Sequence, residues 1–244
     1  MRASARHQLK QDRFAQTVAG TAVDTFSWAT HHRRTTIIGG VVAAMVLAAA
    51  VGGWFYWQRQ GEAASEELGR AMRIYEAPVV AKDAAMPPGT LTFTSAEARA
   101  RAAQKAFQQI ADKYPHTASG RLARYFNALA LRDEGNHSAA EAQLKQVADF
   151  RDKDVAALAR YGLASLYAAT NRDADAVRLY KDLADHPTNT VSKSTAQLEL
   201  AALYEAKQPQ DARRIYEQIR SEDPKSAAAQ TAAERLSALG NPKL

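Results

Sequence analysis

GLASLYAATNRDADAVRLYKDLADHP, residues 162–187, has the pattern of two helices joined by a short turn. Alanine, leucine, lysine and arginine, which favour helix, occupy both halves, and an asparagine and two aspartates interrupt them in the middle. In the second half Ala176, Tyr180 and Leu183 stand at i, i+4 and i+7, which is one face of a helix. Pro187 then ends that helix. The stretch therefore predicts a helix–turn–helix unit.

The trio of small, large and branched apolar residues recurs along the chain. Its small member occurs at intervals of 37, 36 and 36 residues, as Ala103, Ala140, Ala176 and Ala212. The large members are Phe107, Leu144, Tyr180 and Tyr216, and the aliphatic members are Ile110, Val147, Leu183 and Ile219. One such unit cannot bury its apolar face alone. Successive units are therefore predicted to stack into an all-α helical-repeat solenoid.

The helices that precede each trio repeat as well. LARYFNALAL from Leu122 and LARYGLASLY from Leu158 align at an offset of 36 residues, and LELAALY from Leu198 continues the series. Glycine, asparagine or proline marks the turn inside each unit. We expect these turns at residues 133–137, 170–174 and 206–210. Before the first trio, Thr94 and Glu97 have the spacing of a capping box, which predicts that a helix begins after Thr94.

The unit resembles the tetratricopeptide repeat, with a small residue and a tyrosine on the first helix, an alanine and an aromatic on the second, and a final proline. This resemblance implies that partner proteins bind the concave surface formed by the first helices. There, Tyr125 and Tyr161 hold equivalent positions, each preceded by an arginine, Arg124 or Arg160, and Leu198 keeps the register in the third unit. These five residues are the predicted partner-binding residues.

The chemistry of that surface is predicted to be aromatic and partly apolar. In the family, a lysine and asparagine pair binds a partner's C-terminal carboxylate. This pair is absent here, because the residues at these two positions are Tyr125 with Leu129 in one unit and Tyr161 with Ser165 in the next. Such a surface suits exposed hydrophobic segments. The alternative is that both tyrosines pack between helices.

An uncharged run, TTIIGGVVAAMVLAAAVGGWFYWQ, occupies residues 35–58. As a helix, residues 37–57 span roughly 30 Å, the thickness of a bilayer's hydrocarbon core. The closing aromatics, Trp54 to Trp57, are typical of a membrane interface. A buried core helix is one alternative. A signal peptide cleaved near Ala50 is another, but its apolar run is usually only about 7–15 residues long. We therefore expect a retained transmembrane helix.

Small residues form a stripe along this helix, at intervals of four residues. They are Gly40, Ala44, Ala48 and Gly52. Such a stripe lets a second membrane helix approach closely, so it is a predicted helix contact. Glycine and alanine are common in membrane helices, and chance remains the other explanation.

Positive charge is concentrated before the apolar run. The chain carries a net charge of +6, and residues 1–34 contribute six basic and two acidic residues to it. The positive-inside rule then predicts that this tail stays in the cytoplasm. The larger domain has no basic stripe with interleaved aromatics, so no nucleic-acid partner is expected.

Signals of catalysis are missing from the sequence. The six histidines are scattered, there are no cysteines, and no metal-ligand spacing, phosphate loop or nucleophile motif occurs. We expect a protein that is not an enzyme and has no catalytic, cofactor-binding or metal-binding residues.

The predicted organisation has five segments. They are a basic cytoplasmic tail (1–34), a transmembrane helix (35–58), a linking helix and loop insertion (59–94), tetratricopeptide-like repeats (95–224) and a C-terminal capping helix (225–244).

This layout resembles the single-pass ancillary subunit of the bacterial Sec translocon, most closely over GGVVAAMVLAAAVGGWFYWQRQGEAASEELGRAM, residues 39–72. The resemblance implies a bacterial inner-membrane protein whose repeat domain is periplasmic. Its implied partners are translocon subunits, periplasmic chaperones and newly exported chains. Two other functions stay open, namely a scaffold for cell-envelope assembly or division machinery and a regulator acting through the cytoplasmic tail.

Overall fold

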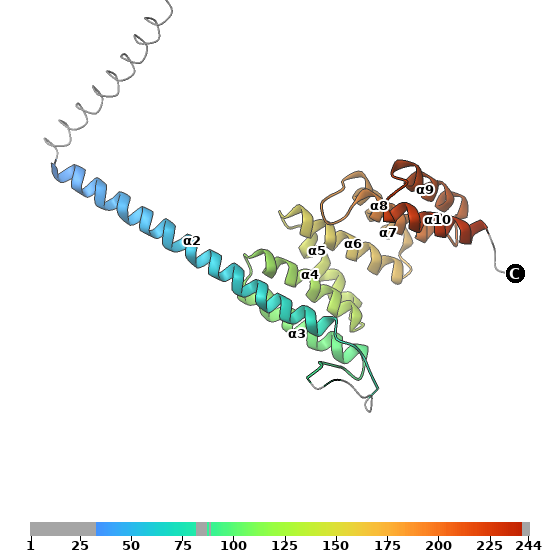
Figure 1. The fold of residues 1–244 in the computed structure, drawn as a ribbon, viewed down its shortest axis with the longest axis horizontal. Helices are drawn as coiled ribbons and strands as arrows, with labels where there is room; N and C mark the ends of the chain where they lie inside the picture. The colour runs from blue at the N-terminus through green and yellow to red at the C-terminus, as the bar shows by residue number, and fades with distance from the viewer. Residues whose placement is uncertain (1–32, 82–86, 88, 241–244) are drawn as a thin grey trace, which may run out of the picture. The chain divides into compact units, whose positions relative to one another are not determined.

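A computed structural model describes residues 33–81, 87 and 89–240 of the chain (Figure 1). The predicted all-α class is confirmed, since these residues form helices and an isolated bridge between Val79 and Phe93 but no strand. The helices are α2 (Arg33–Tyr75), α3 (Ala96–Lys113), α4 (Ala118–Asp133), α5 (His137–Ala148), α6 (Lys153–Ala169), α7 (Asp173–Asp185), α8 (Lys193–Tyr204), α9 (Pro209–Glu222) and α10 (Ala227–Gly240). Their contacts divide the chain into two units, Met1–Arg59 and Gln60–Leu244.

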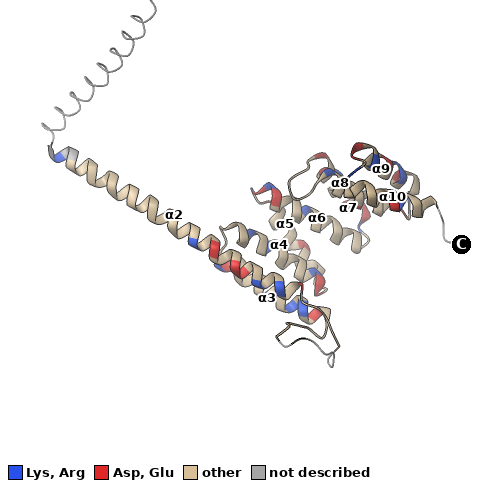
Figure 2. Cartoon of the chain, in the orientation of Figure 1, with Lys and Arg blue, Asp and Glu red and all other residues tan. Residues whose placement is uncertain are grey.

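The first unit contains the apolar part of α2. This helix includes a segment that is long and apolar enough to cross a membrane, with a mean hydropathy of 2.1 in a window of which no residue is buried. Figure 2 shows no charged residue on α2 between Arg34 and Arg59. The aromatic residues Trp54 to Trp57 are all exposed. Exposed apolar side chains over this length suit a lipid environment better than water.

The second unit consists of antiparallel helix pairs. The C-terminal part of α2, from Gln60, lies alongside α3 and forms the first pair (Figure 1). The pairs α4–α5, α6–α7 and α8–α9 follow, and α10 packs on α8 and α9 as the terminal helix. The predicted trios hold these pairs together, because all twelve of their side chains are at most 3% exposed. The prediction of a repeating core is therefore confirmed.

The turns inside the units occur where the sequence places them. Helices α4, α6 and α8 end at Asp133, Ala169 and Tyr204. Two of these turns need the left-handed backbone region, and they use Gly135 at φ +90° and Asn171 at φ +60°. Glycine and asparagine are the residues that adopt this region most readily.

The start of α3 differs from the prediction by one residue. Ser95, not Thr94, is the N-cap, and its hydroxyl accepts a hydrogen bond of 3.1 Å from the Ala98 amide. With Ser95 as the cap, Glu97 is the second helical residue rather than the third. It therefore loses the register from which a capping-box side chain reaches back to the cap amide. Both hydroxyl residues are good caps, and the sequence does not distinguish them.

Buried side chains form three clusters in the second unit. The N-terminal cluster joins α2, α3 and α4 around Phe107, the central cluster joins α4 to α8 around Leu144 and Tyr180, and the C-terminal cluster joins α8, α9 and α10 around Tyr216. Four partly buried side chains border two clusters each. They are Tyr75 and Phe126 at the first junction and Tyr204 and Ile215 at the second.

Candidate functional site

Tyr125, the first predicted partner-binding tyrosine, packs between helices. Its side chain on α4 is only 7% exposed and belongs to the central cluster. On α6, a Cβ atom added to Gly162 would lie 3.4 Å from the Tyr125 ring, so the absence of a side chain at Gly162 makes room for the tyrosine. Burial raises the pKa of the Tyr125 hydroxyl. The packing alternative therefore describes this residue.

Tyr161 occupies the equivalent position on α6 and is half-buried. Its hydroxyl donates a hydrogen bond of 2.9 Å to Glu199 Oε1 on α8, and its ring packs edge-to-face on Tyr180 with centroids 5.8 Å apart. Burial, together with the Glu199 carboxylate, raises the pKa of the Tyr161 hydroxyl. Tyr161 therefore joins two consecutive first helices.

The other predicted residues lie in different surroundings. Arg160 Nη1 is 3.8 Å from Asp182 Oδ2 on α7, and Leu198 is half-buried against the C-terminal cluster. Among the described residues from Gln60 onward, the exposed large hydrophobic side chains are Val79 and Leu91. The repeat domain, where it is described, thus offers mainly polar side chains to a partner.

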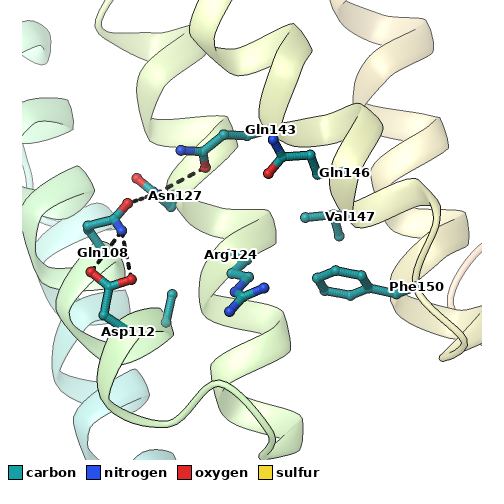
Figure 3. A pocket seen from close by; sticks show the side chains of 9 residues that line it. Gln108, Asp112, Arg124, Asn127, Gln143, Gln146, Val147 and Phe150 are labelled. Atoms are coloured by element: carbon teal, nitrogen blue, oxygen red, sulfur yellow. Dashed lines mark hydrogen bonds between the residues drawn. The ribbon is translucent and has the colours of Figure 1, made fainter.

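Arg124 lies in a cavity of about 200 Å³ between α3, α4 and α5 (Figure 3). We call this cavity the amide groove, and its lining residues are Gln108, Ala111, Asp112, Arg124, Asn127, Gln143, Gln146, Val147 and Phe150. The Arg124 guanidinium carbon is 5.8 Å from the centroid of the Phe150 ring, a favourable cation–π geometry. No hydrogen bond or ion pair to Arg124 occurs within the described part of the chain.

A chain of side-chain amides crosses the groove (Figure 3). The Asp112 carboxylate accepts two hydrogen bonds, of 3.0 and 2.9 Å, from Gln108 Nε2. Gln108 Oε1 then accepts from Asn127 Nδ2 at 2.6 Å, and the same nitrogen donates to Gln143 Oε1 at 3.1 Å. Because an ionised carboxylate only accepts hydrogen bonds, Asp112 fixes the direction of the whole chain.

The amide chain leaves two groups unpaired. Asn127 is 1% exposed, and its Oδ1 is buried without a hydrogen-bond partner in the described structure. Gln143 Nε2, at the end of the chain, has no acceptor among the described residues. An unpaired buried polar atom costs about 1–3 kcal/mol, and this cost applies to Asn127 Oδ1 but not to Gln143 Nε2, which is not a buried atom.

A second cavity, of about 510 Å³, adjoins the amide groove and shares Arg124 and Phe150 with it. Arg121, Arg151 and Asp152 also line it. Arg121 pairs with Asp152 at 3.0 Å, which leaves the charges of Arg124 and Arg151 without a paired acid among the described residues. The combined groove is therefore positively charged at its Phe150 end.

This groove was not among the sites predicted from the sequence. Arg124 was predicted to lie beside Tyr125 on one surface, whereas the structure buries Tyr125 and directs Arg124 into the cavity between α3 and α5. The available signal was Asn127, an amide inside the otherwise apolar run FNALAL, residues 126–131. A buried asparagine at such a position usually has fixed hydrogen-bond partners.

The predicted membrane-helix contact lies on α2. Gly40, Ala44, Ala48 and Gly52 are all exposed, and a Cβ atom added at Gly40 or Gly52 would meet nothing within 4 Å. Elsewhere in the described residues, no group of three or more histidine, aspartate or glutamate side chains is placed to hold a metal ion.

The helix pairs, the repeating core and the apolar helix define a helical-repeat protein whose described residues include one helix long and apolar enough to span a membrane. Residues 27–241 match the family model of the tetratricopeptide repeat-like domain, and the chain belongs to this family. No curated protein and no solved structure matches the chain. Helical repeats of this type suggest a protein–protein interaction scaffold, and the predicted absence of enzymatic activity agrees with the usual role of the family.

Proposed function

We propose that this chain is a single-pass scaffold of the bacterial inner membrane that holds partner proteins next to the Sec translocon. Its repeat domain would be periplasmic, and its partners would be translocon subunits, periplasmic chaperones or newly exported chains. The observation that carries this proposal is the composition of α2. That one helix contains the apolar segment, and it also contributes Ala64 and Ala71 to the first buried cluster of the repeats.

The short connection between these two parts of α2 supports the scaffold role. Six residues separate Trp57, the last interfacial aromatic, from Ala64, the first buried residue of the repeat domain. Even fully extended, such a segment reaches only about 25 Å. The proposed function therefore confines the bound partners to the neighbourhood of the membrane surface. The stripe from Gly40 to Gly52 would contact a translocon helix.

Photo-crosslinking in native membranes tests the partners. One crosslinker replaces Ala48 in the small-residue stripe, and another replaces Ser165, one turn after Tyr161 on α6. We expect translocon subunits at Ala48 and a chaperone or exported chain at Ser165. Envelope-assembly or division proteins at Ser165, without a translocon subunit at Ala48, would replace the proposal with the second type of scaffold.

Labelling of introduced cysteines tests the orientation, because the chain has no cysteine of its own. The variants are Lys225→Cys, just before α10, and Ser4→Cys, in the basic tail. In cells with a permeabilised outer membrane, a maleimide that cannot cross the inner membrane should label only Lys225→Cys. Labelling of Ser4→Cys alone would reverse the proposed orientation.

A further inference from the structure

The amide groove has the chemistry of a peptide main-chain site. Its hydrogen-bond chain ends in an unpaired amide donor, Gln143 Nε2, and the Gln146 amide lies exposed one turn further along α5. A side-chain amide offers one acceptor and two donors, and it therefore matches the C=O and N–H groups of an extended peptide. The Oδ1 of Asn127 is also unpaired, but it is buried, so Gln143 and Gln146 are the amides that a peptide can reach.

The Phe150 end of the groove favours a ligand with a negative charge. Arg124 and Arg151 line the Phe150 end without a paired acid, while the nearby Asp152 is already bound by Arg121. Arginine recognises carboxylates through two parallel hydrogen bonds. The position of Arg124 over the Phe150 ring limits the conformational freedom of this arginine. A carboxylate would thus be bound beside an aromatic wall.

The positive charge distinguishes this groove from a similar cavity in the same chain. Two repeats later, a cavity of about 480 Å³ lies between α7, α8 and α9 and also contains a buried amide with an unpaired oxygen, Gln197 Oε1. Its charged residues are balanced, with Lys181 and Arg214 against Asp185 and Asp211. Of these two cavities, only the groove at Arg124 combines an incomplete amide chain with unpaired arginines.

We propose that the amide groove, together with the adjoining cavity lined by Arg151, binds an extended segment of a partner protein that carries an aspartate or glutamate side chain. The acidic side chain contacts Arg124 and Arg151, and the main chain of the segment pairs with the amides of Gln143 and Gln146. Asn127 is a positioning residue, because it holds Gln108 and Gln143 in place. This inference rests on the proposed scaffold function and adds a site that lies away from Tyr161.

Selection from a library of random decapeptides tests the site, with the full chain held in nanodiscs of neutral lipid. We expect the selected peptides to contain an aspartate or glutamate and to bind about tenfold more weakly to Arg124→Gln, which loses the charge-assisted hydrogen bonds. Arg214→Gln is the matched control in the balanced cavity and should bind them normally. Thermal unfolding of each variant checks that its fold is intact.

A second pair of variants tests the groove through exposed residues that do not support the fold. Both Gln146→Glu and Gln146→Lys lose the amide, but Gln146→Glu also places a negative charge in the groove and should weaken binding much more than Gln146→Lys. Gln109→Glu, on an exposed position of α3 outside both cavities, should leave binding unchanged.

Several outcomes would overturn the inference. They are no enrichment of peptides, enriched peptides without an acidic residue, equal binding to wild type and Arg124→Gln, or complete displacement by inorganic phosphate with no response to the Gln146 variants. The last outcome would identify a simple anion site. If the crosslinks described above still identify a protein partner, the scaffold function stands and only this site is wrong; if neither crosslinker captures a protein, the scaffold function itself fails.

Discussion

The Tyr161 hydroxyl on α6 donates a hydrogen bond of 2.9 Å to Glu199 Oε1 on α8. The equivalent tyrosine one repeat earlier, Tyr125, instead packs on Gly162. Gly162 and Glu199 hold the same register in successive first helices. The tyrosine that meets glycine in the next repeat is therefore buried against it, whereas the tyrosine that meets glutamate is half-buried and forms a hydrogen bond. The two tyrosines thus stabilise the repeat domain in different ways.

We predict that the hydrogen bond between Tyr161 and Glu199 stabilises the contact between α6 and α8. Tyr161→Phe should lower the free energy of unfolding by about 1 kcal/mol, because it removes the donor and leaves the ring in place. Denaturant unfolding of Tyr161→Phe, Glu199→Ala and the double variant forms a double-mutant cycle. The double variant should lose less than the sum of the single losses, and strictly additive losses would show that the two residues are not coupled.

Gly120 is predicted to be intolerant of any side chain. A Cβ atom at this position, in the first turn of α4, would lie 1.8 Å from the Tyr114 carbonyl oxygen. We expect Gly120→Ala to lower the stability by about 2 kcal/mol or more, since the backbone has to move. Gly69→Ala is the matched control, because a Cβ there meets nothing within 4 Å. That helical substitution should raise stability by about 0.5–1 kcal/mol. Equal melting temperatures for the two variants would contradict this prediction.

Acid should weaken the ion pairs around Glu141. Hydrogen bonding to Lys145 above all, and then to Arg172 and Tyr167, lowers the pKa of Glu141 from 4.5 to about 2, although partial burial acts in the opposite direction. A carboxylate with a lowered pKa in the folded state stabilises the fold above its unfolded pKa and loses this contribution as the pH falls through the folded value.

The difference in stability between wild type and Glu141→Gln should therefore be about 1 kcal/mol above pH 5 and shrink as the pH falls from about 4.5 towards 2. Melting temperatures measured across this range check the prediction. Glu217→Gln, at an exposed site without an ion pair among the described residues, should show no such trend. A constant difference for Glu141→Gln would mean that its partners do not stabilise the charged form.

Truncation separates the two roles of α2. A chain that begins at Gln60 keeps Leu68, Met72 and Tyr75 against the N-terminal cluster, whereas a chain that begins at Val79 loses them. Complete burial of such a side chain contributes about 1.5–3 kcal/mol, so the shorter chain should unfold at a clearly lower temperature. Circular dichroism and limited proteolysis would compare the two. Equal stability would show that residues 60–78 do not belong to the repeat domain.

The repeating core could be predicted from the sequence because it depends on a single helix period. Ala176, Tyr180 and Leu183 lie on one face whatever their neighbours are, and burying that face needs only that another helix covers it. The helix ends were also predictable where glycine, asparagine or proline leaves few alternatives. At Thr94 and Ser95, two equivalent caps are adjacent, and the prediction was wrong by one residue.

The amide groove could not be predicted in the same way. Gln108 and Gln143 are 35 residues apart, and each alone has the sequence pattern of a solvated helix surface. Only the packing of both α3 and α5 on α4 brings the two glutamines to Asn127. The two tyrosines show the same limitation, since their environments depend on Gly162 and Glu199 in the following repeat.

The buried side chains form three clusters, and this division affects how the repeat domain unfolds. The clusters are bridged by Tyr75, Phe126, Tyr204 and Ile215. In a linear array, each repeat is stabilised mainly by its nearest neighbours, and an end repeat has one neighbour instead of two. The helices α8–α10 can therefore open as a separate foldon while the central helices stay closed, which would give a gradient of amide hydrogen exchange along the chain. The amide groove lies between α3, α4 and α5, outside this opening unit, so the opening of α8–α10 would leave it intact.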